Sequence, residues 1–78
     1  MSKYLYAVQD ANGREALAAE IETDRVSEVT ARIKDGKLEL LKGKDVVVDI
    51  EAAPETEYNL HRWPADDKLS EPVSKVVK

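Results

Sequence analysis

The chain has 78 residues, a net charge of −4 and no cysteine. This length predicts one small domain with a thin core, and the lack of cysteine excludes disulfides and thiolate metal sites. The negative charge disfavours nucleic acid as a partner, because a nucleic-acid binder normally gathers many cations on one face.

The hydrophobic segments are short. None approaches the roughly 20 apolar residues that a membrane helix needs, and the first residues lack the apolar core of a signal peptide. We therefore expect a cytoplasmic protein that does not contact a membrane.

The first predicted strand is Tyr4–Val8, where apolar residues at both parities indicate burial on two faces. The next segment, 14–22, fits two patterns. As a strand it places Leu17, Ala19 and Ile21 on one face. As a helix it places Leu17 and Ile21 four residues apart on one face, and its alanine and glutamate content favours that helix. Both alternatives remain open.

The segment 25–34 is also ambiguous. A helix would align Val26, Val29 and Ile33, with a glycine just beyond its end. A strand is favoured by the β-branched residues and by the hairpin that it would form with the residues that follow. We predict the strand.

That hairpin is centred on Asp35-Gly36, which predicts a two-residue type I′ turn because both residue types tolerate positive φ. Closing this turn sets Ile33 opposite Leu38 and Arg32 opposite Glu39. Apolar residues then face apolar residues and a cation faces an anion, so local chemistry and register agree.

A second hairpin is predicted around the next glycine. A three-residue loop at 42–44 would place Leu40 opposite Val46, and the hydrophobic pattern favours it. The alternative is a two-residue turn that pairs Lys42 with Asp45. The three-residue loop gives one continuous apolar face, made of Ala31, Ile33, Leu38, Leu40, Val46, Val48 and Ile50.

Two further expectations concern the rest of the chain. Val47 points away from this apolar face, which predicts that its strand is central in the sheet. A last strand over 56–63 would place Tyr58 and Leu60 inward and end at a proline. Residues 64–78 are polar and are predicted to form a flexible tail, although its three valines could dock as an edge strand.

Together these elements predict a mainly β fold, an antiparallel meander of five or six short strands curled into a roll or barrel. Residues 1–63 would form the single domain and 64–78 the tail. The alternative fold class is α+β, with one helix within 14–34 packed on an antiparallel sheet.

Residues suited to catalysis are few. His61 is the only histidine, and we interpret it as an exposed or edge-strand residue rather than a general base. The serines have no nucleophile-elbow context, and the glycines form no phosphate-binding loop. We predict that the protein is not an enzyme and needs no metal or cofactor.

The remaining candidates are residues for binding a partner. Tryptophan, tyrosine and arginine are common at binding hot spots, and lysines on adjacent hairpins could cluster at one end of the sheet. The predicted partner-binding residues are Tyr4, Tyr6, Arg62, Trp63, Lys37, Lys42 and Lys44.

The function that these candidates favour is a non-enzymatic interaction, assembly or inhibitor module that acts through a sheet edge or an aromatic patch. We expect a protein partner or a homodimer, because pairing buries area that a small chain cannot bury alone. The alternative is a small nucleic-acid-binding barrel that uses the lysine-bearing hairpins.

Overall fold

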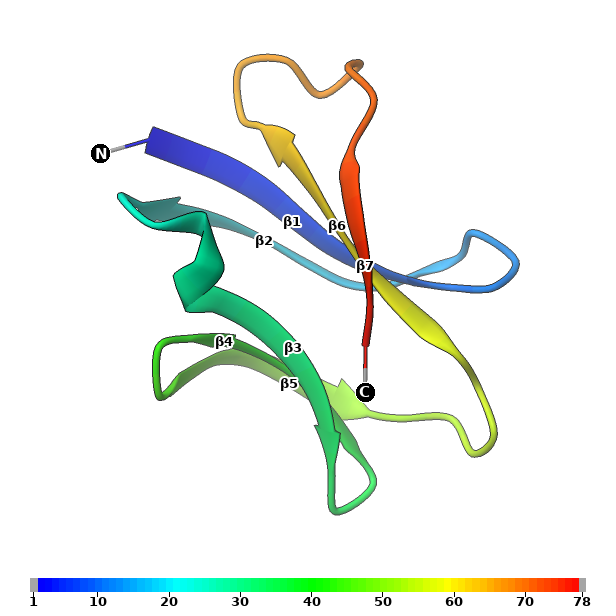
Figure 1. Ribbon diagram of the computed structural model, residues 1–78. Coiled ribbons are helices and arrows are strands. Elements are labelled where there is room, and N and C mark those ends of the chain that lie inside the picture. Colours follow the sequence, from blue (N-terminus) through cyan, green and yellow to red (C-terminus); the bar gives the residue numbers. More distant parts are fainter. Residues whose placement is uncertain (1, 78) are drawn as a thin grey trace.

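The computed structural model describes residues 2–77, which form two antiparallel sheets (Figure 1). The first sheet has the strand order β2-β1-β6-β7 and the second has the order β3-β4-β5. The elements are β1 (Ser2–Asp10), β2 (Glu15–Thr23), the short 3-10 helix η1 (Val26–Glu28), β3 (Val29–Lys34), β4 (Lys37–Lys42), β5 (Asp45–Glu51), β6 (Tyr58–Pro64) and β7 (Val73–Val76). The fold is mainly β, as predicted.

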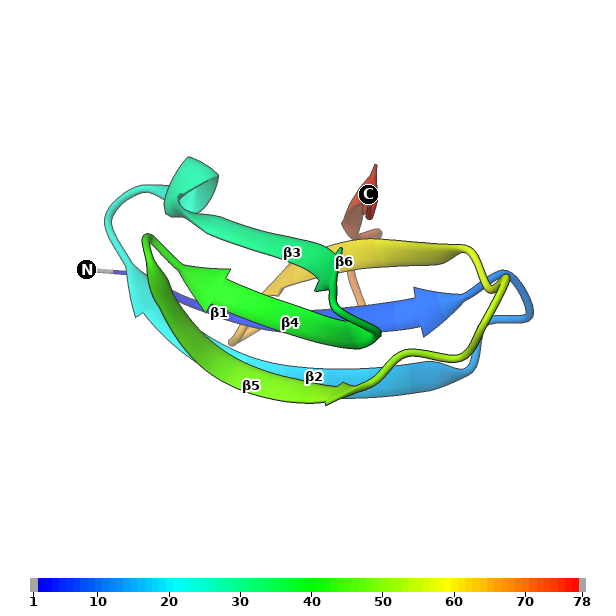
Figure 2. The same cartoon turned by 90° about the horizontal axis from the view of Figure 1, so that it is seen from below.

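The two sheets lie face to face. Figure 2 shows the second sheet stacked on the first, with β5 running along β2, and these two strands are in contact. The buried residues that form the core come from both sheets and are Tyr6, Val8, Leu17, Ile21, Val29, Leu38, Leu40, Tyr58, Leu60 and Val77.

Strand β2 shows that the segment 14–22, which fits both a helix and a strand by sequence, is a strand. Leu17 and Ile21 are buried, and they lie opposite Val8 and Tyr4 of β1. The helix alternative for 14–22 is therefore wrong. The helical propensity of alanine and glutamate is outweighed, because alternation buries the aliphatic residues against β1 while the glutamates face solvent.

The segment 25–34 is divided between two elements. Its first residues form η1 and its last six form β3, so the helix alternative is wrong here as well. The predicted register around Asp35-Gly36 is confirmed: Ile33 lies opposite Leu38, and Arg32 lies opposite Glu39. Both turn residues have positive φ, 53° and 76°. The Arg32 Nε donates to Glu39 Oε1 at 2.6 Å.

The predicted register of the next hairpin is wrong. Lys42 lies opposite Asp45, as in the two-residue alternative, but a bulge then shifts the register. Val47 is the extra residue, so Leu40 faces Val48 instead of Val46. The bulge returns the apolar residues of β5 to the core side, while the residues beside it are left exposed.

Strand β5 is an edge strand, not the central one expected. Val46 and Val47 are 44% and 46% exposed because no strand covers them. Ile33, at the end of β3, is also exposed. The other members of the predicted apolar face are buried or pack against the core.

Strand β6 returns to the first sheet and pairs with β1, and its Tyr58 and Leu60 are buried as predicted. Strand β7 then pairs with β6 as the fourth strand. The edge-strand alternative for the last valines thus describes Val73–Val76, and the Val77 N–H donates to the Tyr58 carbonyl at 3.0 Å. No helix in residues 2–77 has the length and apolar character to cross a bilayer.

Candidate partner-binding site

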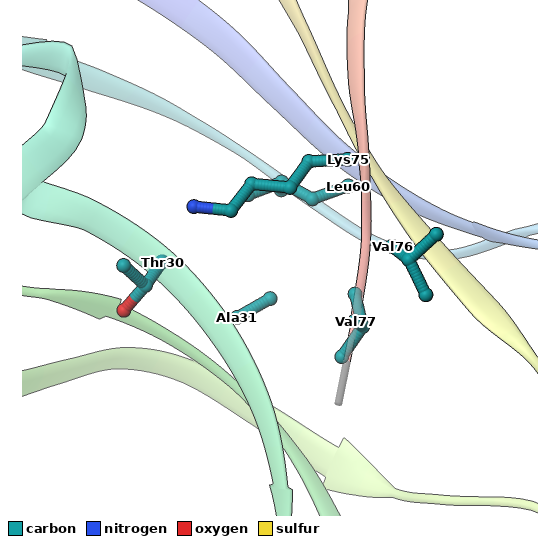
Figure 3. Close-up of a pocket in the computed structure, with 6 residues that line it drawn as sticks. All are labelled: Thr30, Ala31, Leu60, Lys75, Val76 and Val77. Carbon is teal, nitrogen blue, oxygen red and sulfur yellow. The ribbon is translucent and has the colours of Figure 1, made fainter.

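A cavity of about 600 Å³ lies between two unpaired strand edges. Strand β3 ends the second sheet and β7 ends the first, so each is hydrogen-bonded on one side only. Figure 3 shows Thr30 and Ala31 of β3 on one side of the cavity and the residues of β7 on the other. The backbone groups on the free sides of both strands are available to an extended chain.

A smaller cavity of about 240 Å³ adjoins the first, since both are lined by Leu60 and Lys75. The remaining residues of the smaller cavity come from β1, η1, β3, β6 and β7 and are Tyr6, Val26, Ser27, Val29, Arg62 and Val73. We call the two cavities together the β3–β7 groove. It is mainly aliphatic, with a few polar groups at one end.

Tyr6 is the most buried of these polar groups. Its side chain is 1% exposed, and its Oη has no hydrogen-bond partner within residues 2–77. Burial raises the pKa of the phenol, an effect that nearby Arg62 opposes and Tyr4 reinforces. The hydroxyl therefore keeps its proton at neutral pH and is able to donate a hydrogen bond.

Arg62 lies directly opposite Tyr6 in the pairing of β1 with β6. Its guanidinium carbon is 5.6 Å from the centroid of the Tyr4 ring, a cation–π geometry. Neither Arg62 nor Lys75 forms an ion pair with any residue in the range 2–77. Two cations without an ion-pair partner in the described residues thus line the smaller cavity.

The four sheet edges differ in charge. Strands β2 and β5 carry acidic residues and no cations, whereas β3 and β7 carry cations and no acidic residues. The acidic residues are Glu15, Glu20, Glu22, Asp45, Asp49 and Glu51, and the cations are Arg32, Lys34 and Lys75. Because Arg32 is paired with Glu39, the cations of β3 and β7 that have no ion pair within residues 2–77 are Lys34 and Lys75.

The predicted aromatic residues do not form one patch. Tyr4 and Tyr6 lie on the inner face of the first sheet with Arg62, while Trp63 follows on the outer face. Trp63 lies opposite Leu5, and its ring centroid is 5.9 Å from that of His61. Alternation along β6 separates neighbouring residues onto opposite faces, so the Arg62-Trp63 pair does not act as a unit.

His61 is not on an edge strand, because β6 lies between β1 and β7. Its Nδ1 is 2.6 Å from the Ser74 Oγ on β7. A base beside a hydroxyl is one part of a nucleophile arrangement, which also needs a group that orients the base. This pair lies on the outer face of the sheet and lines neither cavity of the groove.

The lysines do not cluster as expected. Lys37 begins β4 beside the first turn, whereas Lys42 ends β4 beside the second turn with Lys44. The expectation is wrong because successive hairpins of a meander turn at opposite ends of the sheet. The Lys42 Nζ donates to the Glu22 carbonyl at 2.8 Å, so it connects the two sheets.

Sequence patterns missed several groove residues. Lys75 and Val73 lie in the segment predicted as a tail, and Ser27 lies in η1. The three valines at positions 73, 76 and 77 are the sequence signal for a strand there. No group of three potential metal ligands occurs within the described range 2–77.

Comparison with known proteins gives no match to a family model, a curated protein or a solved structure.

Proposed function

We propose that this protein is a non-enzymatic interaction module, acting in assembly or inhibition, and that it binds a protein partner through β3 and β7. The observation that supports this function is the β3–β7 groove, where two unpaired edges from different sheets border an aliphatic cavity. Extended peptides commonly bind by adding a strand to such an edge.

The other two edges are protected. Natural sheets discourage edge pairing with charged residues and bulges, and β5 has both while β2 carries three glutamates. Strand β7 has less protection, because Val73 and Val76 are 57% and 64% exposed. An exposed apolar edge in a small protein is a feature that a partner would cover.

The arrangement of the two sheets also differs between the β2 and β5 edges and the β3 and β7 edges. We propose that the two sheets form a roll that is closed along β2 and β5 and open along β3 and β7. Contact between β2 and β5 supports the closed side, and the larger cavity supports the open side. Such a roll would keep its core intact while it offers one slot to a partner.

A protein partner is favoured over nucleic acid because the lysines of the two hairpins lie at opposite ends of β4. A non-enzymatic role is favoured because the single histidine lies outside the groove. We further propose a cytoplasmic location, which suits a chain without cysteine.

We also propose that the protein forms a homodimer, and that the dimer uses the outer face of the first sheet. Trp63 and His61 lie together there beside Leu5, with their rings tilted by 30°, away from the groove. Sedimentation over a wide concentration range tests this proposal, and the fluorescence of the single tryptophan should change on association. A monomer at every concentration would exclude the dimer.

The edge function is tested by capturing partners from the native host with matched variants. Val73→Lys with Val76→Lys adds charge to β7, and Val46→Lys with Val47→Lys adds the same charge to exposed valines of β5. We expect partners recovered by the wild type to be lost from the β7 variant and kept by the β5 variant, as judged by quantitative mass spectrometry. Equal recovery by all three proteins would contradict the proposal.

A further inference from the structure

We propose that the β3–β7 groove selects an extended acidic segment, and that an aspartate or glutamate of this segment places its carboxylate between Tyr6, Arg62 and Lys75. The inference rests on the proposed function and defines the chemistry of the partner.

Three residues that can donate hydrogen bonds, Tyr6, Arg62 and Lys75, line the smaller cavity. The Tyr6 hydroxyl is a buried donor without a partner in residues 2–77. Arg62 supplies a guanidinium, and Lys75 extends its side chain from β7 across Leu60 toward the start of β3 (Figure 3). A carboxylate accepts several hydrogen bonds and carries the charge that these two cations lack.

The unpaired Tyr6 hydroxyl is the strongest indication of a ligand in this cavity. A buried polar group without a hydrogen bond costs folding free energy, and phenylalanine would avoid that cost with almost the same shape. The raised pKa of the phenol keeps it protonated, so it acts as a donor to an anion. A ligand that accepts this hydrogen bond would explain why a hydroxyl is present there.

The shape of the groove favours a peptide over a small carboxylate. The larger cavity adjoins the smaller one and offers aliphatic contacts from Ala31, Leu60 and Val77. A strand that runs between β3 and β7 can direct every second side chain into the groove, with the acidic residue at its polar end. A small carboxylate would occupy the polar end and leave the rest unused.

A second copy of this chain is a poorer occupant. Its acidic residues on β2 and β5 belong to strands that already pair and pack in the two sheets. A separate segment without a fixed structure can enter the groove, whereas a folded edge would need to unpack first.

The test titrates the isotope-labelled protein with acetyl-Ser-Val-Thr-Glu-Thr-Val-Ser-amide and follows backbone amide signals by NMR. The matched control peptide replaces the glutamate with glutamine, and sodium butyrate tests a free carboxylate. We expect the glutamate peptide to shift signals of β3 and β7 and to bind at least about tenfold more tightly than the control, because hydrogen bonds to charged groups are the strong ones.

Three variants separate the parts of the site. Tyr6→Phe, Arg62→Met and Lys75→Met should each weaken the glutamate peptide by about tenfold, and the same Tyr6→Phe protein should melt at a higher temperature than the wild type. Lys34→Met removes a cation of β3 that does not line the groove and should leave affinity unchanged.

Each contrary result has a distinct meaning. If both peptides bind equally, the carboxylate site is wrong while the groove still binds a strand, so the proposed function stands. Butyrate that binds as tightly as the glutamate peptide would replace the peptide with a small ligand. Signals of β3 and β7 that move with protein concentration alone would show self-association in the groove. Absence of binding by both peptides, or a lower melting temperature for Tyr6→Phe, would overturn the inference.

Discussion

Tyr6 and Arg62 lie directly opposite each other on β1 and β6, and the hydroxyl of the tyrosine is buried without a hydrogen bond in the described range 2–77. The two residues come from opposite ends of the chain and meet only when β6 returns to the first sheet. This pairing places a costly polar group beside a cation, at the end of the groove where we propose that a carboxylate binds.

The first prediction concerns the free energy of this hydroxyl. Tyr6→Phe should stabilise the unliganded protein by about 1 kcal/mol, because it removes a buried donor without a partner and keeps the ring. For a domain of this size the melting temperature should rise by about 5 °C. Urea denaturation and calorimetry measure the effect. A destabilised variant would mean that the hydroxyl has a bonding partner in solution.

The second prediction follows from the raised pKa of Tyr6. In the unfolded chain the phenol titrates near 10.0, and in the folded protein it holds its proton to higher pH. This titration thus leaves the free energy of unfolding unchanged below about pH 10 and lowers it as the pH rises toward the folded-state pKa, because the unfolded state then binds fewer protons.

Urea denaturation between pH 9 and 11 tests this sign. The wild type should lose more free energy of unfolding over this range than Tyr6→Phe, in which the remaining tyrosines still titrate. Parallel pH profiles for the two proteins would show that Tyr6 does not contribute.

The third prediction concerns the loop between β6 and β7. The Lys68 Nζ donates to Glu20 Oε1 at 3.0 Å, and this hydrogen bond and the lysine charge lower the pKa of Glu20. The lowered pKa means that the stabilising effect is present above the ordinary pKa of a glutamate and is lost as the pH falls through the folded-state value.

Glu20→Gln should therefore speed amide exchange in residues 66–71 while the exchange of the core strands stays the same. Raising the salt concentration should have a similar, smaller effect on the wild type, since both side chains are exposed. Faster exchange throughout both sheets would contradict a local role for this ion pair.

The fourth prediction concerns the turn between β3 and β4. Gly36 has φ +76° and no atom within 4 Å of the position that a Cβ would occupy. Gly36→Ala should thus cost only backbone strain, about 1 kcal/mol of unfolding free energy. Asp35→Asn should be neutral or slightly stabilising, because Asn-Gly suits the same turn.

Urea denaturation of the two single variants distinguishes the causes. A loss in Asp35→Asn without a loss in Gly36→Ala would indicate that the aspartate side chain, rather than the positive φ, determines the stability of the turn.

The part of the fold that could be predicted is the part that depends on neighbours in sequence. The Asp35-Gly36 hairpin combines a specific turn type with complementary pairs such as Ile33 and Leu38, and its register is correct. The inward direction of Tyr58 and Leu60 also follows from alternation alone.

The bulge at Val47 could not be predicted, because three successive valines do not indicate which of them faces the core. Sequence patterns predict strand β7 only as an alternative to a flexible tail, since its pairing depends on β6 and a polar loop separates the two strands. The groove needs the same long-range pairing, which brings Tyr6, Arg62 and Lys75 together. Sequence patterns selected two of these residues by type and did not indicate that they meet.

A single nucleotide substitution converts a tyrosine codon to a phenylalanine codon. At position 6 that substitution would remove a hydroxyl that lowers stability in the free protein, so it is both accessible and favourable for folding. In a lineage whose protein no longer binds a ligand through this hydroxyl, the tyrosine should be replaced by phenylalanine. Persistent tyrosine, together with a cation at position 62, would mark the descendants that still use the groove.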